Sequence, residues 1–169
     1  MDAGAAGLCL FVVTGRCFMK RVYWMILVLA LALAACGGKT AEKNVDLNVV
    51  YDSLVNTLPE MLVLDEAMQL NLLGVDSADC QQIITAICAD SMRVDEVWLI
   101  QAKDAAALSR MKELAQIRID SQAEVCESYS PDQYAIVKKA EVLNDGLYLA
   151  LLIGPDPAGL RQTVAEAIR

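Results

Sequence analysis

The sequence contains no histidine and few aromatic residues, and its basic residues are outnumbered by acidic ones. Histidine is the most common general base and metal ligand in proteins, so its absence removes the usual means of acid–base chemistry. With 14 lysines and arginines against 22 aspartates and glutamates, the formal net charge is −8. Such a chain offers no basic surface for phosphates, which argues against nucleic acid as a partner and against adhesion to anionic lipid by charge alone.

The six cysteines match neither a CxxC motif nor the spacing of a zinc site. Three of them lie within the first 36 residues, and Cys80, Cys88 and Cys126 lie in the remainder. Outside the cytoplasm, an odd number of cysteines leaves at least one free thiol. Because each of the three is surrounded by apolar residues, we expect buried thiols, with one disulfide as the alternative.

A short apolar run near the N-terminus has the pattern of a signal peptide. It follows the basic pair Lys20 and Arg21 and extends from Val22 to Ala35. A membrane-spanning helix needs roughly 20 apolar residues, whereas the core of a signal peptide needs about 7 to 15. The length therefore favours a signal peptide. Because Met19 directly precedes the basic pair, we expect it to be the functional start.

The apolar run ends in Leu33-Ala34-Ala35-Cys36, which resembles the bacterial lipobox. The resemblance implies that the Cys36 thiol receives a diacylglyceryl group and that Cys36 becomes the mature amino terminus. Two acyl chains hold a protein stably on a membrane, whereas one chain does so only marginally. The alternative is an ordinary secretory signal with a cleavage site of the Ala-x-Ala kind.

The sequence thus predicts three segments. Residues 1–35 form the signal peptide, residues 36–45 carry the lipidated cysteine and a flexible tether, and residues 46–169 form a single domain. A chain of this size buries enough surface for one core without metal or disulfide. We expect an extracytoplasmic protein that is anchored to the outer face of the cell membrane by its lipid.

Hydrophobic periodicity predicts the order of helices and strands in the domain. Apolar residues three and four positions apart predict helices, and short β-branched or apolar runs predict strands. The predicted elements are helices over 46–58 and 65–73, strands over 83–88 and 96–102, a long helix over 104–128, a short helix from 131, strands over 139–143 and 147–153, and a last helix from 157.

These elements predict an α+β domain. Each pair of neighbouring strands is expected to form a hairpin, and Asn144-Asp145-Gly146 supplies the turn of the second one. We expect a four-stranded antiparallel sheet with helices packed on one face and the long helix between the two hairpins. The short helix is expected to begin with a capping box, Ser130-Pro131-Asp132-Gln133.

Four segments stand out along the domain: Asp95-Glu96-Val97-Trp98-Leu99-Ile100, Lys103-Asp104, Tyr129-Ser130-Pro131-Asp132-Gln133-Tyr134, and Asn144-Asp145-Gly146 with Tyr148. In these segments the sequence resembles the domain-of-unknown-function 4358 family of lipoproteins from Gram-positive bacteria. The resemblance covers roughly Asp46 to Arg169. Because this family has no established activity or catalytic residues, it implies a location and a domain extent but no reaction.

Few side chains qualify as functional candidates. Asp95 and Glu96 are neighbours on a predicted strand and point to opposite faces, so they cannot flank one bond; we expect one exposed and one paired carboxylate. Tyr129 and Tyr134 bracket the predicted turn, where tyrosines are usually half-buried, and form a candidate binding surface. Trp98 faces either a ligand groove, where it would be part of the binding surface, or the core.

These observations favour a non-enzymatic binding module of the cell envelope. Its partner would be an envelope protein, a peptide or a cell-wall fragment, and the membrane contact would be made by the lipid on Cys36. No residue pattern predicts a catalytic group, a metal site or a cofactor. The alternative is an envelope enzyme that uses carboxylates or a bound metal, for which the acidic residues offer ligands but no organised cluster.

Overall fold

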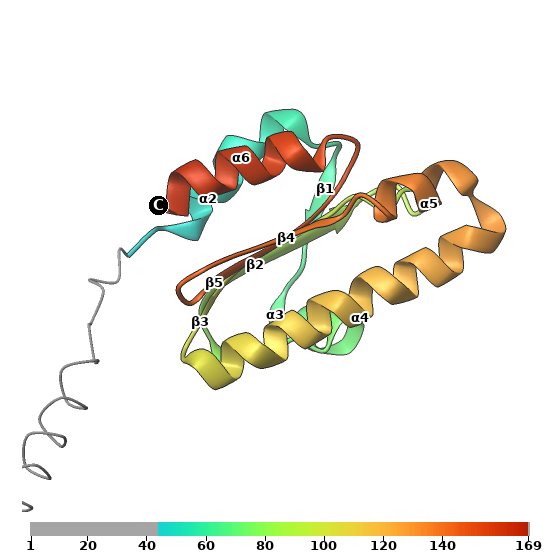
Figure 1. Cartoon of the computed structure of the whole chain (residues 1–169). Helices are drawn as coiled ribbons and strands as arrows, with labels where there is room; N and C mark the ends of the chain where they lie inside the picture. The colour runs from blue at the N-terminus through green and yellow to red at the C-terminus, as the bar shows by residue number, and fades with distance from the viewer. Residues whose placement is uncertain (1–43, 169) are drawn as a thin grey trace, which may run out of the picture. The chain divides into compact units, whose positions relative to one another are not determined.

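A five-stranded antiparallel sheet forms the centre of the folded part of the chain in the computed structural model, which describes residues 44–168 (Figure 1). The predicted signal peptide, Cys36 and nearly all of the tether lie outside the described residues. The strand order is β1-β2-β3-β5-β4. The strands are β1 (Met61–Val63), β2 (Cys80–Cys88), β3 (Glu96–Ala102), β4 (Glu141–Asp145) and β5 (Tyr148–Ile153).

The predicted class, α+β with an antiparallel sheet, is confirmed, but the predicted number of four strands is wrong. The additional strand is β1, which pairs with the end of β2 through Met61 and Cys88. It has only three residues, and none of them is buried. A strand this short and this exposed shows no alternation of apolar and polar residues, so periodicity cannot reveal it.

Helices cover both faces of the sheet, not one face as the sequence predicts (Figure 1). On one face lie α2 (Leu47–Leu54) and α6 (Pro157–Ile168), and on the other lie α4 (Ala105–Tyr129) and α5 (Pro131–Val137). Every residue of β3 and β5 is buried. Strands that are buried on both faces need a layer on each side, and the unbroken apolar run of β5 is typical of such strands.

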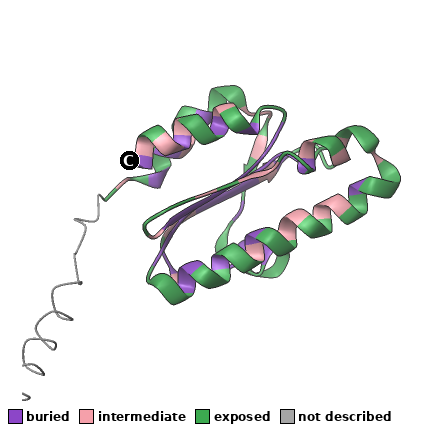
Figure 2. Ribbon diagram, in the orientation of Figure 1, coloured by how far each residue is buried: buried purple, intermediate pink, exposed green. Residues whose placement is uncertain are grey.

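The sheet separates two hydrophobic cores, because successive residues of a strand point to opposite faces. Figure 2 shows the buried residues along the sheet and on the inward sides of the helices. The α4-side core contains Trp98, Ile100, Leu149, Leu151 and Ile153 with Leu108, Met111 and Ala115 of α4. The α6-side core contains Val97, Leu99, Ala150 and Leu152 with Leu47, Val50 and Leu54 of α2 and Leu160, Val164 and Ile168 of α6.

Short helical segments connect α2 to β1 and β1 to β2. The predicted second helix is present as α3 (Glu66–Met68), which continues as a π-helical turn, η2 (Gln69–Leu73). Gly74 ends it with a φ of 70°, a left-handed conformation that glycine adopts without strain. The remaining short segments are the 3-10 turns η1 (Val55–Thr57) and η3 (Ser77–Asp79).

Aspartates cap the N-termini of helices α2 and α4. The Asp46 carboxylate accepts a hydrogen bond from the Asn48 N–H at 2.9 Å, and the Asp104 carboxylate accepts one from the Ala107 N–H at 2.8 Å. These bonds satisfy N–H groups that have no partner within the helix. Both helix starts were predicted from the sequence.

The predicted capping box at Ser130 does not form. Among the described residues, the Ser130 side chain makes no capping hydrogen bond. The backbone N–H of Ser130 still belongs to α4, since it donates to the Cys126 carbonyl at 2.9 Å. The Gln133 side chain therefore cannot close the box and instead accepts a hydrogen bond from the Val94 N–H at 3.1 Å.

Candidate functional site

A cleft of about 360 Å³ lies between the turn that follows β2 and the corner where α4 meets α5. We call it the α4–α5 cleft. Its walls come from segments far apart in the sequence: the end of β2, the turn into β3, the C-terminal half of α4 and the start of α5. The residues that line it include Cys88, Met92, Arg93, Asp95, Glu96, Arg118, Gln122, Val125, Cys126, Tyr129 and Gln133.

Glu96 forms a buried charged group at the floor of this cleft. Its side chain is 1% exposed, and its Oε2 lies 2.8 Å from Nη2 of Arg118. The indole Nε1 of Trp98 donates a hydrogen bond to Oε1 at 2.6 Å, and Gln122 Nε2 donates to Oε2 at 3.4 Å. A buried carboxylate needs such partners. The network fastens the middle of α4 to the start of β3.

Asp95 is held in a similar way by a residue close in sequence. Its carboxylate accepts hydrogen bonds from Nε and Nη2 of Arg93 at 2.9 and 3.1 Å. These hydrogen bonds raise the pKa of Arg93 above its ordinary value, and the negative charge of Asp95 contributes a smaller effect in the same direction. Both carboxylates are thus buried and paired, so the prediction that one of them is exposed is wrong. Each has an arginine partner that the spacing of the two acids does not reveal.

The three cysteines are buried and unpaired in the described part of the chain, as the sequence favoured. Cys88 and Cys126 contribute to the walls of the α4–α5 cleft, whereas Cys80 lies in the α4-side core at the start of β2. Burial raises the pKa of the Cys80 thiol to about 11. The Cys80 thiol therefore stays protonated, and unreactive as a nucleophile, at neutral pH.

The rim of the cleft is apolar and open to solvent. Met92 is 78% exposed, Val125 57% and Tyr129 87%. Tyr129 thus lies on an accessible surface, although the sequence predicted it to be half-buried. Large apolar side chains that are exposed together beside a concave surface are typical of contact sites.

The other two predicted binding residues do not share that surface. Trp98 is fully buried in the α4-side core, which decides between its two predicted environments. Tyr134 is half-buried against the same core, and the Lys138 ammonium lies 5.9 Å from the centre of its ring. Of the three candidates, only Tyr129 is among the residues that line the α4–α5 cleft.

Met92 and Val125 were missed by the sequence analysis. Val125 directly precedes Cys126, which lies on the apolar stripe of the long helix. In the sequence, Val125 therefore looks like an ordinary residue of the helix surface. Met92 lies in a turn between two strands, where periodicity carries no information. Only the packing of α4 over the β2–β3 turn brings these two side chains to one rim.

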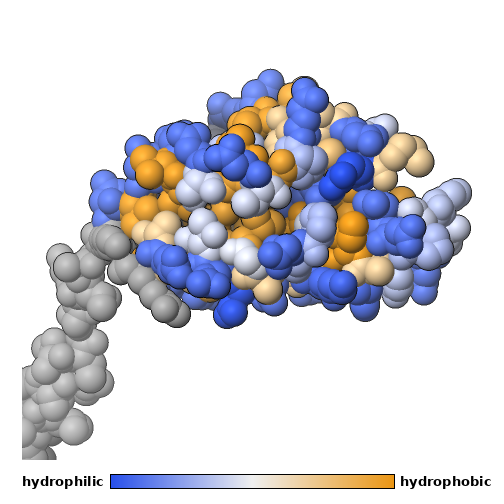
Figure 3. Space-filling model, turned by 90° about the horizontal axis from the view of Figure 1, so that it is seen from above, coloured by the Kyte–Doolittle hydropathy of each residue, from blue (hydrophilic) through white to orange (hydrophobic). Residues whose placement is uncertain are grey.

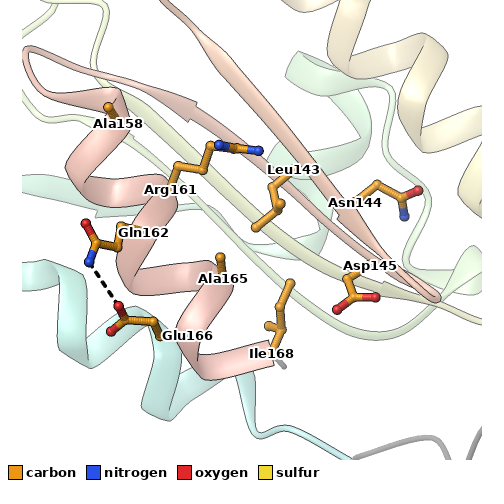
Figure 4. Close-up of a pocket in the computed structure, with 9 residues that line it drawn as sticks. All are labelled: Leu143, Asn144, Asp145, Ala158, Arg161, Gln162, Ala165, Glu166 and Ile168. Carbon is orange, nitrogen blue, oxygen red and sulfur yellow. Dashed lines mark hydrogen bonds between the residues drawn. The ribbon is translucent and has the colours of Figure 1, made fainter.

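A second concave surface lies between β4 and α6, on the opposite face of the sheet (Figure 4). We call it the β4–α6 groove; its volume is about 590 Å³. Figure 3, which views the molecule from the side of α2 and α6, shows apolar patches separated by hydrophilic residues on this side. The groove is lined by Leu143, Asn144 and Asp145 of β4 and by Ala158, Arg161, Gln162, Ala165, Glu166 and Ile168 of α6.

Within residues 44–168, no three histidine, cysteine, aspartate or glutamate side chains are grouped so that they could hold a metal ion. In the same part of the chain, no helix combines the length and the apolar character that crossing a membrane requires.

The chain thus contains an α+β domain with helices on both faces of a five-stranded antiparallel sheet. Residues 55–154 match the family described as Domain of unknown function (DUF4358), and the chain belongs to this family. The family membership inferred from the sequence is thereby confirmed. The match extends from η1 to the end of β5 and contains every residue of the α4–α5 cleft, whereas α6 lies beyond it. Neither a curated protein nor a solved structure matches the chain.

Proposed function

We propose that this chain is a membrane-anchored extracytoplasmic lipoprotein whose folded domain is a non-enzymatic binding module of the cell envelope. The observation that carries the binding role is the α4–α5 cleft, which combines an exposed apolar rim with a floor of internally paired charges. Its partner is an envelope protein or a peptide that inserts an apolar side chain.

The rim supports this role because exposed Met92, Val125 and Tyr129 lose water contact when a partner covers them. Tyrosine and methionine are enriched at the centres of protein interfaces, where they provide large contact areas. A cleft of about 360 Å³ is large enough for one aromatic or branched aliphatic side chain with its neighbouring backbone. The rim and the cleft together form a site for an anchor residue.

The floor supports the same role because its carboxylates already have partners. Arg93 binds Asp95 with two hydrogen bonds, and Arg118 and Trp98 bind Glu96. Groups engaged in this way stabilise the walls of a cleft rather than exchange protons with a ligand. An apolar anchor can cover them without leaving any of these charges unpaired.

The binding role is tested with N-acetyltryptophanamide as a minimal anchor. Titration into a ¹⁵N-labelled fragment covering residues 44–169 should shift the backbone amide signals of Met92, Val125 and Tyr129 in a saturable manner. Val125→Asp should abolish these shifts and leave the melting temperature unchanged, because this side chain is exposed. Shifts that persist in Val125→Asp, or that occur elsewhere on the domain, would contradict the assignment of the cleft.

The lipoprotein assignment rests on the sequence of residues 20–36, which lies outside the described residues. Cys36→Ser should abolish labelling of the protein by a fatty-acid probe, because only the thiol accepts the diacylglyceryl group. Deletion of residues 1–18 should leave labelling and export intact if Met19 is the start. Label that persists in Cys36→Ser would refute the attachment site, and failed export of the shortened chain would refute the start.

A further inference from the structure

We infer that β4 and the β4–α6 groove form a second binding site, which takes an extended peptide segment of another protein as an additional strand of the sheet. The segment carries an apolar residue with lysine or arginine two positions before and two positions after it. This site is separate from the α4–α5 cleft, since the two share no lining residue. The inference does not depend on the role proposed for that cleft.

The backbone of β4 provides the first reason. β4 is the last strand on its side of the sheet, so one row of its backbone groups has no strand of the described chain beside it. Asp145 pairs with Tyr148 across the two-residue turn of Gly146 and Leu147, and Leu143 pairs with Ala150. In such a hairpin these are the hydrogen-bonded pairs. The N–H and C=O groups of Val142 and Asn144 therefore point outward, as strand addition requires.

The groove beside β4 provides the second reason. A strand added to an edge needs room for the side chains that it directs toward the neighbouring helix. Ala158 and Ala165 on α6 are small, and they leave the space between the helix and β4 open, with Leu143 and Ile168 as its apolar surfaces (Figure 4). An apolar residue of the added strand would lie beside Leu143.

The charges around the groove identify the chemistry of the occupant. Glu141 and Asp145 lie two positions before and two positions after Leu143 along β4, so their side chains are on the same side of the strand as Leu143. The one cation among the lining residues is Arg161, whose Nε lies 3.6 Å from Oε2 of Glu141. The carboxylates outnumber the guanidinium, so basic residues placed two positions from the apolar residue meet opposite charges on the neighbouring strand.

The same charges argue against a second copy of this chain as the occupant. If two β4 strands paired in antiparallel fashion about Leu143, Glu141 of each copy would face Asp145 of the other on the same side of the sheet. Like charges directly opposite each other destabilise a strand pair. The net charge of −8 adds a general repulsion between copies.

The test uses the full-length chain in dodecyl maltoside micelles and a fluorescein-labelled peptide, Thr-Lys-Thr-Val-Thr-Lys-Thr, followed by fluorescence anisotropy at low salt. We expect saturable binding of this peptide. A control peptide with glutamate in place of both lysines should bind about tenfold more weakly, because two favourable charge pairs become unfavourable. Equal binding of the two peptides, or no binding of either, would overturn the inference.

Two protein variants separate strand addition from simple attraction of charge. Val142→Pro removes an outward N–H and no hydrogen bond to β5, so it should weaken peptide binding about tenfold and leave the melting temperature unchanged. If this variant fails to fold, the double variant Glu141→Gln with Asp145→Asn, which neutralises both carboxylates beside Leu143, should reduce the preference for the lysine peptide to less than about threefold. Unchanged binding in a folded Val142→Pro, or an unchanged preference in the double variant, would refute the proposed geometry. A dimer in gel filtration that Val142→Pro dissociates would show that a second copy occupies the edge instead.

Discussion

The helices on the two faces of the sheet differ in how much of their length the sheet covers. α6 has 12 residues and is buried at intervals from Pro157 to Ile168, its whole length. α4 has 25 residues, but four of its five buried residues lie between Ala107 and Ala115, and the fifth is Cys126. A helix of that size is roughly 37 Å long, whereas a seven-residue strand such as β3 spans roughly 23 Å.

The excess length of α4 accounts for the α4–α5 cleft. Its N-terminal half packs on the sheet, and its C-terminal half extends beyond the strand ends, where α5 and the β2–β3 turn meet it. Val125 and Tyr129 lie in this half and are exposed beside the cleft, whereas Cys126 is buried. A helix longer than its sheet thus leaves room for a cleft, whereas a matched helix such as α6 completes a core.

The largest expected effect comes from placing the same charge in the two halves of α4. Met111→Asp should lower the free energy of unfolding by about 4 kcal/mol, because Met111 is 1% exposed in the α4-side core. Val125→Asp should change it by less than about 0.5 kcal/mol. Urea denaturation of both variants gives the two values directly. Similar losses would mean that Val125 is buried in the folded domain.

The ion pair at the border between the halves should have the next largest effect. Arg118→Met leaves the buried Glu96 carboxylate without its cation and should cost about 3 kcal/mol. Adding Glu96→Gln should recover much of this loss, because the glutamine oxygen still accepts from Trp98. Arg161→Met, at the exposed pair with Glu141 on α6, should cost less than about 0.5 kcal/mol. If the double variant is no more stable than Arg118→Met, the buried charge is not the cause.

A smaller effect is expected beneath the N-terminal half of α4, at Gly74. Gly74→Ala should cost about 2 kcal/mol, because its φ is 70° and a Cβ would lie 3.3 Å from Cδ2 of Leu114. The control is Gly146→Ala, which has a φ of 54° and open space around the added Cβ. It should cost about 1 kcal/mol, from backbone strain alone. Equal midpoints of urea denaturation would show that α4 does not press on the Gly74 turn.

The smallest effect concerns an exposed pair on the N-terminal half of α4. Nη2 of Arg110 donates to Asp79 at 2.6 Å, and this hydrogen bond lowers the pKa of Asp79 below its ordinary value of 3.8. A lowered pKa in the folded state adds stability above the unfolded value, and this stability is lost as the pH falls through the folded value. Asp79→Asn should therefore lower the melting temperature slightly at neutral pH and not at all well below pH 3.8. A difference that persists in acid would exclude the ion pair as its source.

Local features of the fold could be predicted from the sequence because they depend on neighbouring residues. The bounds of β3 are 96–102, as the apolar run indicates, and the stripe of Leu160, Val164 and Ile168 is the buried side of α6. The aspartate caps of α2 and α4 follow from residue type and position in the same way. In each case, burial in the folded domain agrees with the local pattern.

Features that depend on distant residues could not be predicted. Arg118 lies on a helix and Glu96 on a strand, and nothing in either segment indicates that the two side chains meet. Gln133 has the spacing of a capping residue, but its side chain instead accepts a hydrogen bond from the Val94 N–H, which lies in a turn distant in sequence. The candidate site was predicted only through Tyr129, because its other rim residues meet through the packing of α4 on the β2–β3 turn.

The way in which the domain holds its first residues determines how it responds to mechanical force. The Val45 N–H donates to the Tyr148 hydroxyl at 3.0 Å, and Gln82 Nε2 donates to the Val45 carbonyl at 2.9 Å. Tyr148 belongs to β5 and Gln82 to β2, the two strands that flank β3 in the middle of the sheet. A pull on the chain ahead of Val45 is therefore shared between two interior strands of the sheet.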